Sequence, residues 1–234
     1  MLLRCKNPEQ PEALRWLDTA RGTGAGGVEE VTLRTDRGEI VCRYHPAPGA
    51  VAGVVWVGGA GGGLDGPARG LYPEACRRLQ RQGIAGLRLH YRMPNYLEDC
   101  VLDTLLGAEF LAGEGAAVCG LVGHSFGGAV VISAGALSER VGAIIPMSTQ
   151  TYGTGLAPRV APRPMLLVHG TADEVLPPSC SEQVYARAGE PKELVLYPGA
   201  RHGLDEAREE LLDLLVRWLP AHLRARETPL QRAA

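Results

Sequence analysis

The strongest constraint on the fold is a series of short, uninterrupted apolar runs that recur between residues 54 and 197. A strand with one solvated face alternates apolar and polar residues, and these runs do not alternate. They are typical of strands that are buried on both faces, as in a parallel sheet. The runs are residues 54–57, 87–91, 118–122, 143–147, 165–168 and 194–197.

Segments with helical periodicity separate most of these runs. Several of them are followed by glycine, which commonly ends a helix because it adopts the left-handed conformation. The last segment, residues 204–223, places Leu211, Leu215 and Trp218 on one apolar stripe that should pack against the sheet. The other predicted helices are residues 71–82, 97–112, 126–137 and 179–188. This alternation of strands and helices predicts β-α-β units.

The first part of the chain follows a different pattern. Residues 11–20 form a short helical candidate, and the glycine-rich residues 22–27 complete a partly flexible N-terminal arm, residues 1–27. Two β-rich runs, residues 28–36 and 39–45, predict an antiparallel hairpin at the edge of the sheet.

These elements predict one three-layer α/β domain. Its sheet has eight strands, mostly parallel, with the antiparallel hairpin at the N-terminal end and helices on both faces. We expect the domain to cover residues 28–224 and a C-terminal tail to follow at residues 225–234.

Composition narrows the classes of function. Of the 234 residues, 45% are hydrophobic, 24 are Lys or Arg and 26 are Asp or Glu, which fits one globular domain and gives no basic patch for nucleic acid. No apolar run is long enough to span a membrane, and the first residues lack the apolar core of a signal peptide, so we expect a cytoplasmic protein. The six cysteines have no Cys-x-x-Cys spacing and predict buried thiols.

The pentapeptide at residues 123–127, Gly-His-Ser-Phe-Gly, matches the pattern G-x-S-x-G. It lies between a predicted strand and a predicted helix, which is the setting of a nucleophilic serine on a sharp turn. The flanking glycines remove Cβ atoms that would collide with the neighbouring strand and helix. An ordinary glycine-rich loop is the alternative, but the strand and helix on either side favour Ser125 as a nucleophile.

A serine hydroxyl needs a base, because it is scarcely ionised at neutral pH. His202 follows the last predicted strand and therefore lies at the same sheet edge as Ser125. Its imidazole can accept and return the serine proton near neutral pH. Four other histidines, on the hairpin, at strand ends and in the last helix, are more typical of structural positions: His45, His90, His169 and His222.

The third member of a catalytic triad would lie between serine and histidine in the chain, after another strand. Asp173 fulfils this in the segment His-Gly-Thr-Ala-Asp and would fix the tautomer of His202. Glu174 is the competing carboxylate, and either acid could instead be a solvated turn residue.

Two backbone N–H groups should bind the oxyanion of the tetrahedral intermediate. One is that of Phe126, directly after the nucleophile, and the other comes from the glycine-rich loop at residues 58–63. Ala60 is the preferred donor, with Gly59 and Gly61 as alternatives. The same loop could bind a nucleotide phosphate, but it lacks the Gly-Lys-Ser/Thr ending of such sites.

Together, these motifs resemble the α/β-hydrolase superfamily, in particular its compact esterase and dienelactone-hydrolase-like branches. The resemblance covers residues 28–223 and implies an α/β-hydrolase fold. Dienelactone hydrolases proper have a cysteine nucleophile, whereas position 125 is serine, and Gly58-Gly59 stands where many relatives have His-Gly. Only residues 149–163 are available for a lid, so a large cap domain is not expected.

Without a cap the pocket should be open, unless a partner chain in a homodimer or the N-terminal arm covers it. We expect it to form from residues 58–67, 91–96 and 149–156. The candidate substrate-binding residues are Gly59, Gly61, Tyr96, Met147 and Tyr152.

The function that the sequence favours is a serine hydrolase that cleaves a small carboxylic ester or thioester through an acyl-enzyme on Ser125, without a metal or other cofactor. Within this fold the same triad could serve an acyltransferase, a peptidase or a carbon–carbon-bond hydrolase. A non-catalytic binding protein and a nucleotide-dependent enzyme are alternatives of a different class.

Overall fold

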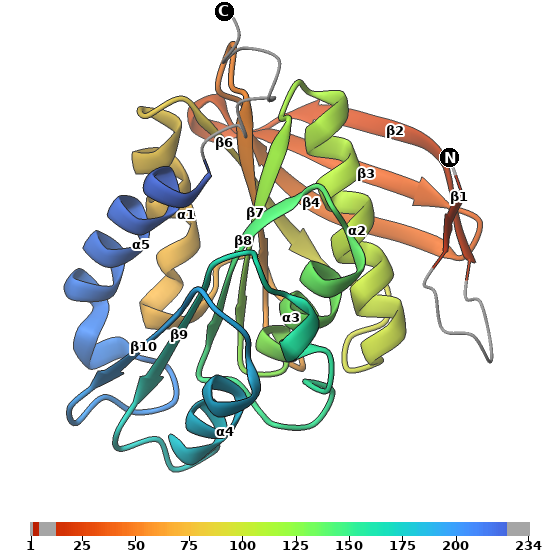
Figure 1. Ribbon diagram of the computed structural model, residues 1–234. Coiled ribbons are helices and arrows are strands. Elements are labelled where there is room, and N and C mark those ends of the chain that lie inside the picture. Colours follow the sequence, from red (N-terminus) through yellow and green to blue (C-terminus); the bar gives the residue numbers. More distant parts are fainter. Residues whose placement is uncertain (1, 5–12, 224–234) are drawn as a thin grey trace, which may run out of the picture.

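The computed structural model describes residues 2–4 and 13–223. Within these residues, ten strands form one sheet in the order β1-β2-β3-β4-β6-β5-β7-β8-β9-β10 (Figure 1). The strands are β1 Leu2–Arg4, β2 Ala13–Thr23, β3 Glu29–Thr35, β4 Gly38–His45, β5 Ala52–Val57, β6 Ile84–His90, β7 Val118–His124, β8 Val141–Met147, β9 Met165–Gly170 and β10 Lys192–Tyr197.

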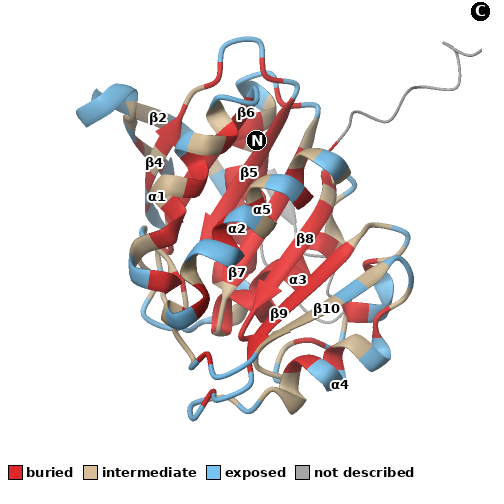
Figure 2. Cartoon of the chain, turned by 90° about the vertical axis from the view of Figure 1, so that its left-hand side faces the viewer, coloured by how far each residue is buried: buried red, intermediate tan, exposed pale blue. Residues whose placement is uncertain are grey.

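The six apolar runs form the six parallel strands that the sequence predicts, β5 to β10, with β5 between β6 and β7. Every residue of β5 and β9 is buried, as expected for strands covered on both faces. The predicted hairpin is β3 and β4, whose buried and exposed residues alternate. Figure 2 shows the central strands almost entirely buried beneath helices with exposed outer surfaces.

The helix predicted at residues 11–20 is wrong. Residues 13–23 form β2, which pairs antiparallel with β3 from Trp16 opposite Thr35 to Thr23 opposite Glu29. A helix would have left the N–H and C=O groups of β3 unpaired along this edge, and pairing with them overrides a weak local helix propensity. The sheet therefore has β1 and β2 in addition to the eight predicted strands.

Helices cover both faces of the sheet, which gives the three predicted layers (Figure 1). Helices α1 (Pro67–Gln80) and α5 (Arg208–His222) pack on each other and on one face. Helices α2 (Leu97–Gly113), α3 (Phe126–Leu137) and α4 (Ser179–Arg187) lie on the other. Between β8 and β9 the structure has only a short 3-10 turn, Ala157–Arg159, so no cap domain is inserted there.

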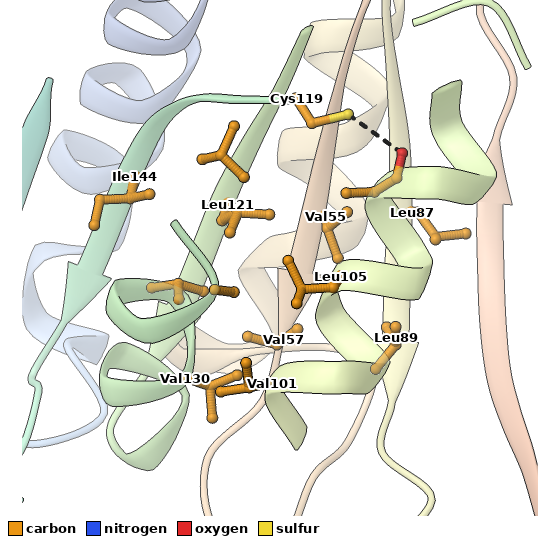
Figure 3. Packing of buried hydrophobic residues seen from close by; sticks show 14 of the residues in the cluster. Val55, Val57, Leu87, Leu89, Val101, Leu105, Cys119, Leu121, Val130 and Ile144 are labelled. Carbon is orange, nitrogen blue, oxygen red and sulfur yellow. Dashed lines mark hydrogen bonds between the residues drawn. The ribbon is translucent and has the colours of Figure 1, made fainter. Parts of the chain in front are cut away.

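The apolar core is divided by the sheet into two clusters. In the cluster drawn in Figure 3, Val55 and Val57 of β5 pack with Leu89 of β6, Val101 of α2 and Val130 of α3. The second cluster joins Trp56 to α1 and includes the predicted stripe of α5. Five cysteines of the described residues are free, four of them buried, as predicted. No helix in the described ranges is long and apolar enough to cross a bilayer.

Candidate active site

The candidate catalytic residues come from loops at the carboxyl ends of parallel strands. Ser125 follows β7, Asp173 follows β9, His202 follows β10, and the glycine-rich loop follows β5. Parallel strands point the same way, so these loops meet at one sheet edge although they are far apart in sequence.

Ser125 lies on a strained turn between β7 and α3. Its backbone dihedrals are φ 59° and ψ −120°, and a positive φ is uncommon for a residue other than glycine. Two hydrogen bonds hold the turn: the Ser125 N–H donates to the Met147 carbonyl at 2.8 Å, and the Gly128 N–H donates to the Ser125 carbonyl at 2.9 Å. Strain of this kind persists only where the surrounding structure enforces it, and it is common at active sites.

The two glycines of the pentapeptide are required by close backbone approach. A Cβ at Gly123 would lie 2.1 Å from the Gly127 carbonyl oxygen, and one at Gly127 would lie 2.3 Å from the Gly58 carbonyl oxygen. Both distances are far below van der Waals contact. The steric reason that the sequence suggested for these glycines is therefore present in the structure.

His202 and Asp173 are in direct contact. The Nδ1 atom of His202 lies 2.8 Å from Oδ2 of Asp173, while Oδ1 of the same carboxylate accepts the N–H groups of Val175 and Leu176, each at 2.9 Å. Burial by itself raises the pKa of Asp173, but the Leu176 N–H, the hydrogen bond with His202 and the Val175 N–H outweigh it, so the pKa lies below its usual value. The carboxylate is thus ionised at neutral pH.

Glu174, the competing acid, has a different position. It is exposed and lines an open hollow of about 290 Å³ together with Arg201 and His202. Its neighbour Asp173 is buried against the imidazole. The geometry therefore favours Asp173 as the partner of His202.

The loop that carries His202 is fixed on three sides. The Ala172 N–H donates to the Ala200 carbonyl at 2.9 Å, and the Ala68 N–H, at the start of α1, donates to the Gly203 carbonyl at 2.7 Å. The third contact comes from His124, whose Nε2 lies 2.8 Å from the carbonyl oxygen of His202 itself. A carbonyl only accepts, so Nε2 of His124 carries the proton.

His124 is a site residue that the sequence analysis did not consider separately. It is the variable position directly before Ser125, and its ring centre lies 4.8 Å from that of His202. Burial is the largest cause that lowers the pKa of His124, to about 4, which keeps the ring neutral near pH 7. Because His124 directly precedes Ser125 in the chain, its contact with His202 brings the candidate base close to the candidate nucleophile.

Within residues 13–223 the hydrogen bonds include none between the Ser125 hydroxyl and the His202 imidazole. Catalytic hydrogen bonds are often long before substrate binds and tighten in the reacting complex. A hydrogen bond between Ser125 and His202 would form beside the ring contact of His124 with His202, where Ser125 is half-buried.

Gly170 makes the close approach between β9 and the His202 loop feasible. A Cβ at this position would lie 2.2 Å from the carbonyl oxygen of Ala200 and 2.9 Å from that of Arg201. These are backbone atoms, so the loop itself would have to move.

We expect Gly170→Ala to displace the His202 loop. The variant should lose about 1 to 3 kcal/mol of stability, the typical cost of overpacking, together with most of any activity that depends on the position of His202. Gly113→Ala is the matched control, because nothing lies within 4 Å of its added Cβ. Thermal denaturation and an esterase assay check both variants, and an active Gly170→Ala protein of normal stability would show that this contact is not needed.

The glycine-rich loop reaches Ser125 through Gly59. A Cβ there would lie 3.5 Å from Cβ of Ser125, and the Gly62 N–H donates to the Gly59 carbonyl at 2.9 Å, which closes a tight turn over Ala60 and Gly61. In the described part of the chain, the backbone hydrogen bonds use neither the N–H of Ala60 nor that of Phe126. Both candidate oxyanion donors are therefore available.

The site is open, as expected for a protein without a cap. A second hollow of about 330 Å³ is lined by residues 58–59 and 62–67 and by His124. Tyr96 and Tyr152 are exposed on the loops after β6 and β8. Met147, by contrast, is fully buried in the core, so its side chain does not face substrate in this structure; only its carbonyl takes part, by accepting the Ser125 N–H.

Comparison with known proteins gives two partial sequence matches. The family model described as serine aminopeptidase S33 matches residues 155–206, the segment that includes Asp173 and His202. An uncharacterized protein of Escherichia coli, YfhR, is 43% identical over 65 residues, which is 24% of this chain and 22% of that protein. The chain therefore aligns with about a fifth of the curated relatives' length.

Solved structures match nearly the whole domain. Dienelactone hydrolase from Anabaena variabilis superimposes with a TM-score of 0.74 and 19% identity over 85% of this chain and 100% of its own. An α/β serine hydrolase without a lid from Xanthomonas campestris gives a TM-score of 0.69 and 20% identity over 89% of this chain and 100% of its own.

The chain thus has the fold of the α/β hydrolases, in a compact form without an inserted cap domain between β8 and β9. The resemblance inferred from the sequence motifs is confirmed at the level of the fold.

Proposed function

We propose that the protein is a serine hydrolase that cleaves a carboxylic ester or thioester through an acyl-enzyme on Ser125. The observation that carries this proposal is the 2.8 Å contact between His202 Nδ1 and Asp173 Oδ2, in a loop that is hydrogen-bonded to His124, the residue directly before a serine with φ 59°. An oriented imidazole beside a strained serine is the arrangement that activates a hydroxyl.

In this mechanism His202 Nε2 takes the hydroxyl proton while Ser125 Oγ attacks the carbonyl carbon. The N–H groups of Phe126 and Ala60 stabilise the oxyanion, with Gly59 and Gly61 as the alternative to Ala60. The intermediate collapses with release of the alcohol or thiol, which receives the proton from His202. Water, deprotonated by the same imidazole, then hydrolyses the acyl-enzyme and restores the serine.

The open site and the apolar side chains around it support a substrate with an apolar acyl group. Met93, Tyr96, Tyr152 and Val175 are exposed large hydrophobic residues on the loops after β6, β8 and β9. The loop after β8 reaches the start of α2, which directly follows the β6 loop, because a Cβ at Gly153 would lie 2.6 Å from the side chain of Leu97. Exposed apolar side chains that gather at one edge are typical of a binding surface.

Peptidase activity on the same triad is the second candidate, because the aminopeptidase family model matches residues 155–206. Aminoacyl anilides, compared with short acyl esters and thioesters, would separate the two activities.

A fluorophosphonate probe tests the proposal without assuming a substrate. Such probes react with activated serines, and we expect intact-mass analysis to show one adduct and peptide mapping to place it on Ser125. Folded protein that remains unlabelled, or that is labelled at another serine, would contradict the proposal.

A further inference from the structure

His169 lies fully buried at the end of β9, four residues before Asp173. Its Nε2 atom is 3.1 Å from Asp173 Oδ2 and 3.0 Å from the Leu176 carbonyl oxygen. Both neighbours accept hydrogen bonds, so the proton of this imidazole must be on Nε2.

The other ring nitrogen of His169 is also occupied. Its Nδ1 lies 2.6 Å from the hydroxyl oxygen of Ser181, a fully buried residue in the first turn of α4. With the proton on Nε2, Nδ1 can accept, and the Ser181 hydroxyl can donate to it. The contact fixes the orientation of the ring between β9 and α4.

Asp173 is consequently held by four donors. Two backbone N–H groups bind Oδ1, and two imidazoles, those of His202 and His169, share Oδ2. An ionised carboxylate has about four lone-pair positions, so this one is saturated. A carboxylate with all four positions occupied is held in one orientation. The negative charge on Oδ2 is then stabilised by both histidines and not by His202 alone.

The geometry points to His169, held by Ser181, as a positioning residue that fixes the Asp173 carboxylate for His202. This role rests on the proposed function of Ser125, His202 and Asp173. The His169 Nε2–H group keeps Oδ2 directed at His202 Nδ1 and prevents the carboxylate from attracting the imidazolium proton too strongly.

A buried histidine with satisfied hydrogen bonds can also be purely structural. Replacing a purely structural histidine would change the stability of the protein. It would not change the hydrogen bond between His202 and Asp173 or the pH dependence of catalysis. The titratable groups that act on Asp173 besides His169 are His202, His124 and the Cys180 thiol of α4. All three remain in the variants below.

The test compares three variants with the wild-type protein. His169→Gln retains an N–H donor close to the position of Nε2, His169→Leu has a similar volume without a donor, and Ser181→Ala removes only the contact to Nδ1. The first readout is the low-field proton NMR signal of the His202 Nδ1–H group, assigned by its loss in Asp173→Asn. The second is the pH profile of kcat/KM.

We expect His169→Leu to shift or broaden the low-field signal and to lower kcat/KM by about 10- to 100-fold, as for one hydrogen bond to a charged group. The acid limb of the profile should move to higher pH, because a carboxylate with one donor fewer stabilises the protonated form of His202 more strongly. His169→Gln should restore much of both readouts, and Ser181→Ala should give a smaller change in the same direction.

The role of His169 would be overturned if His169→Leu changed neither the low-field signal nor the value and acid limb of kcat/KM. Equal losses of kcat/KM in the His169→Gln and His169→Leu variants would overturn it as well. If His169→Leu does not fold, the Gln and Ser181→Ala variants decide. A different outcome is a wild-type protein that shows no hydrolase activity although its low-field signal changes when His169 is replaced. That result would refute the proposed function and would leave the hydrogen-bond arrangement around Asp173 intact.

Discussion

Replacing Ser125 by alanine should reduce turnover of an ester substrate by about 10⁴- to 10⁶-fold, as expected when the nucleophile of a triad is removed. The fold should be unchanged, because alanine retains the Cβ atom and the Ser125 hydroxyl has no hydrogen bond within the described residues. His202→Ala should lose nearly as much, since the residues of a triad act as a unit. Steady-state hydrolysis, with circular dichroism for the fold, is the measurement.

Ser138→Ala is the matched control for Ser125→Ala. Ser138 lies at the opposite end of α3 from Ser125, and its hydroxyl accepts the Arg140 N–H at 3.3 Å. The Ser138→Ala variant should keep full activity. Substantial hydrolysis by a correctly folded Ser125→Ala protein would exclude an acyl-enzyme on this residue.

Asp173→Asn should lower kcat by about 10⁴-fold through the wrong tautomer of His202. Because Val175 and Leu176 donate to Oδ1, the asparagine oxygen is expected there, which directs the NH₂ group toward His202. Nδ1 of His202 must then accept a hydrogen bond, so its proton moves to Nε2, where the base function is lost.

Glu174→Gln tests the same step with the neighbouring acid. This side chain is exposed at the edge of the hollow, so its loss of charge should change kcat by less than about tenfold. The two variants are compared in one pH-controlled kinetic assay. A larger loss in Glu174→Gln than in Asp173→Asn would assign the acid to Glu174.

Local sequence patterns predicted the parts of the fold that repeat a simple rule. Apolar runs without alternation became β5 to β10, and helix α3 begins and ends at the predicted residues, Phe126 and Leu137. The pattern failed at β2, because this strand is stabilised by pairing with β1 and β3 and not by its own sequence. The described residues do not include 224–234, so the predicted C-terminal tail stays a prediction.

The site shows the same division. The order of Ser125, Asp173 and His202 along the chain, each after a strand, was visible because parallel topology sends all three to one edge. Sequence context favoured Asp173 over Glu174, but only the structure shows which of the two carboxylates the turn after β9 directs toward His202.

The contacts of His124 and His169 and the burial of Met147 have the same cause. The His124–His202 contact joins residues 78 positions apart in the chain, the His169–Ser181 contact joins β9 to α4, and Met147 is buried in the core on one side of the sheet. The amino-acid sequence by itself determined the layered α/β architecture and the types of the candidate catalytic groups, because hydrophobic periodicity and turn chemistry are local. Only the tertiary structure decided which groups touch, because burial and hydrogen-bond geometry are set by all neighbouring elements together.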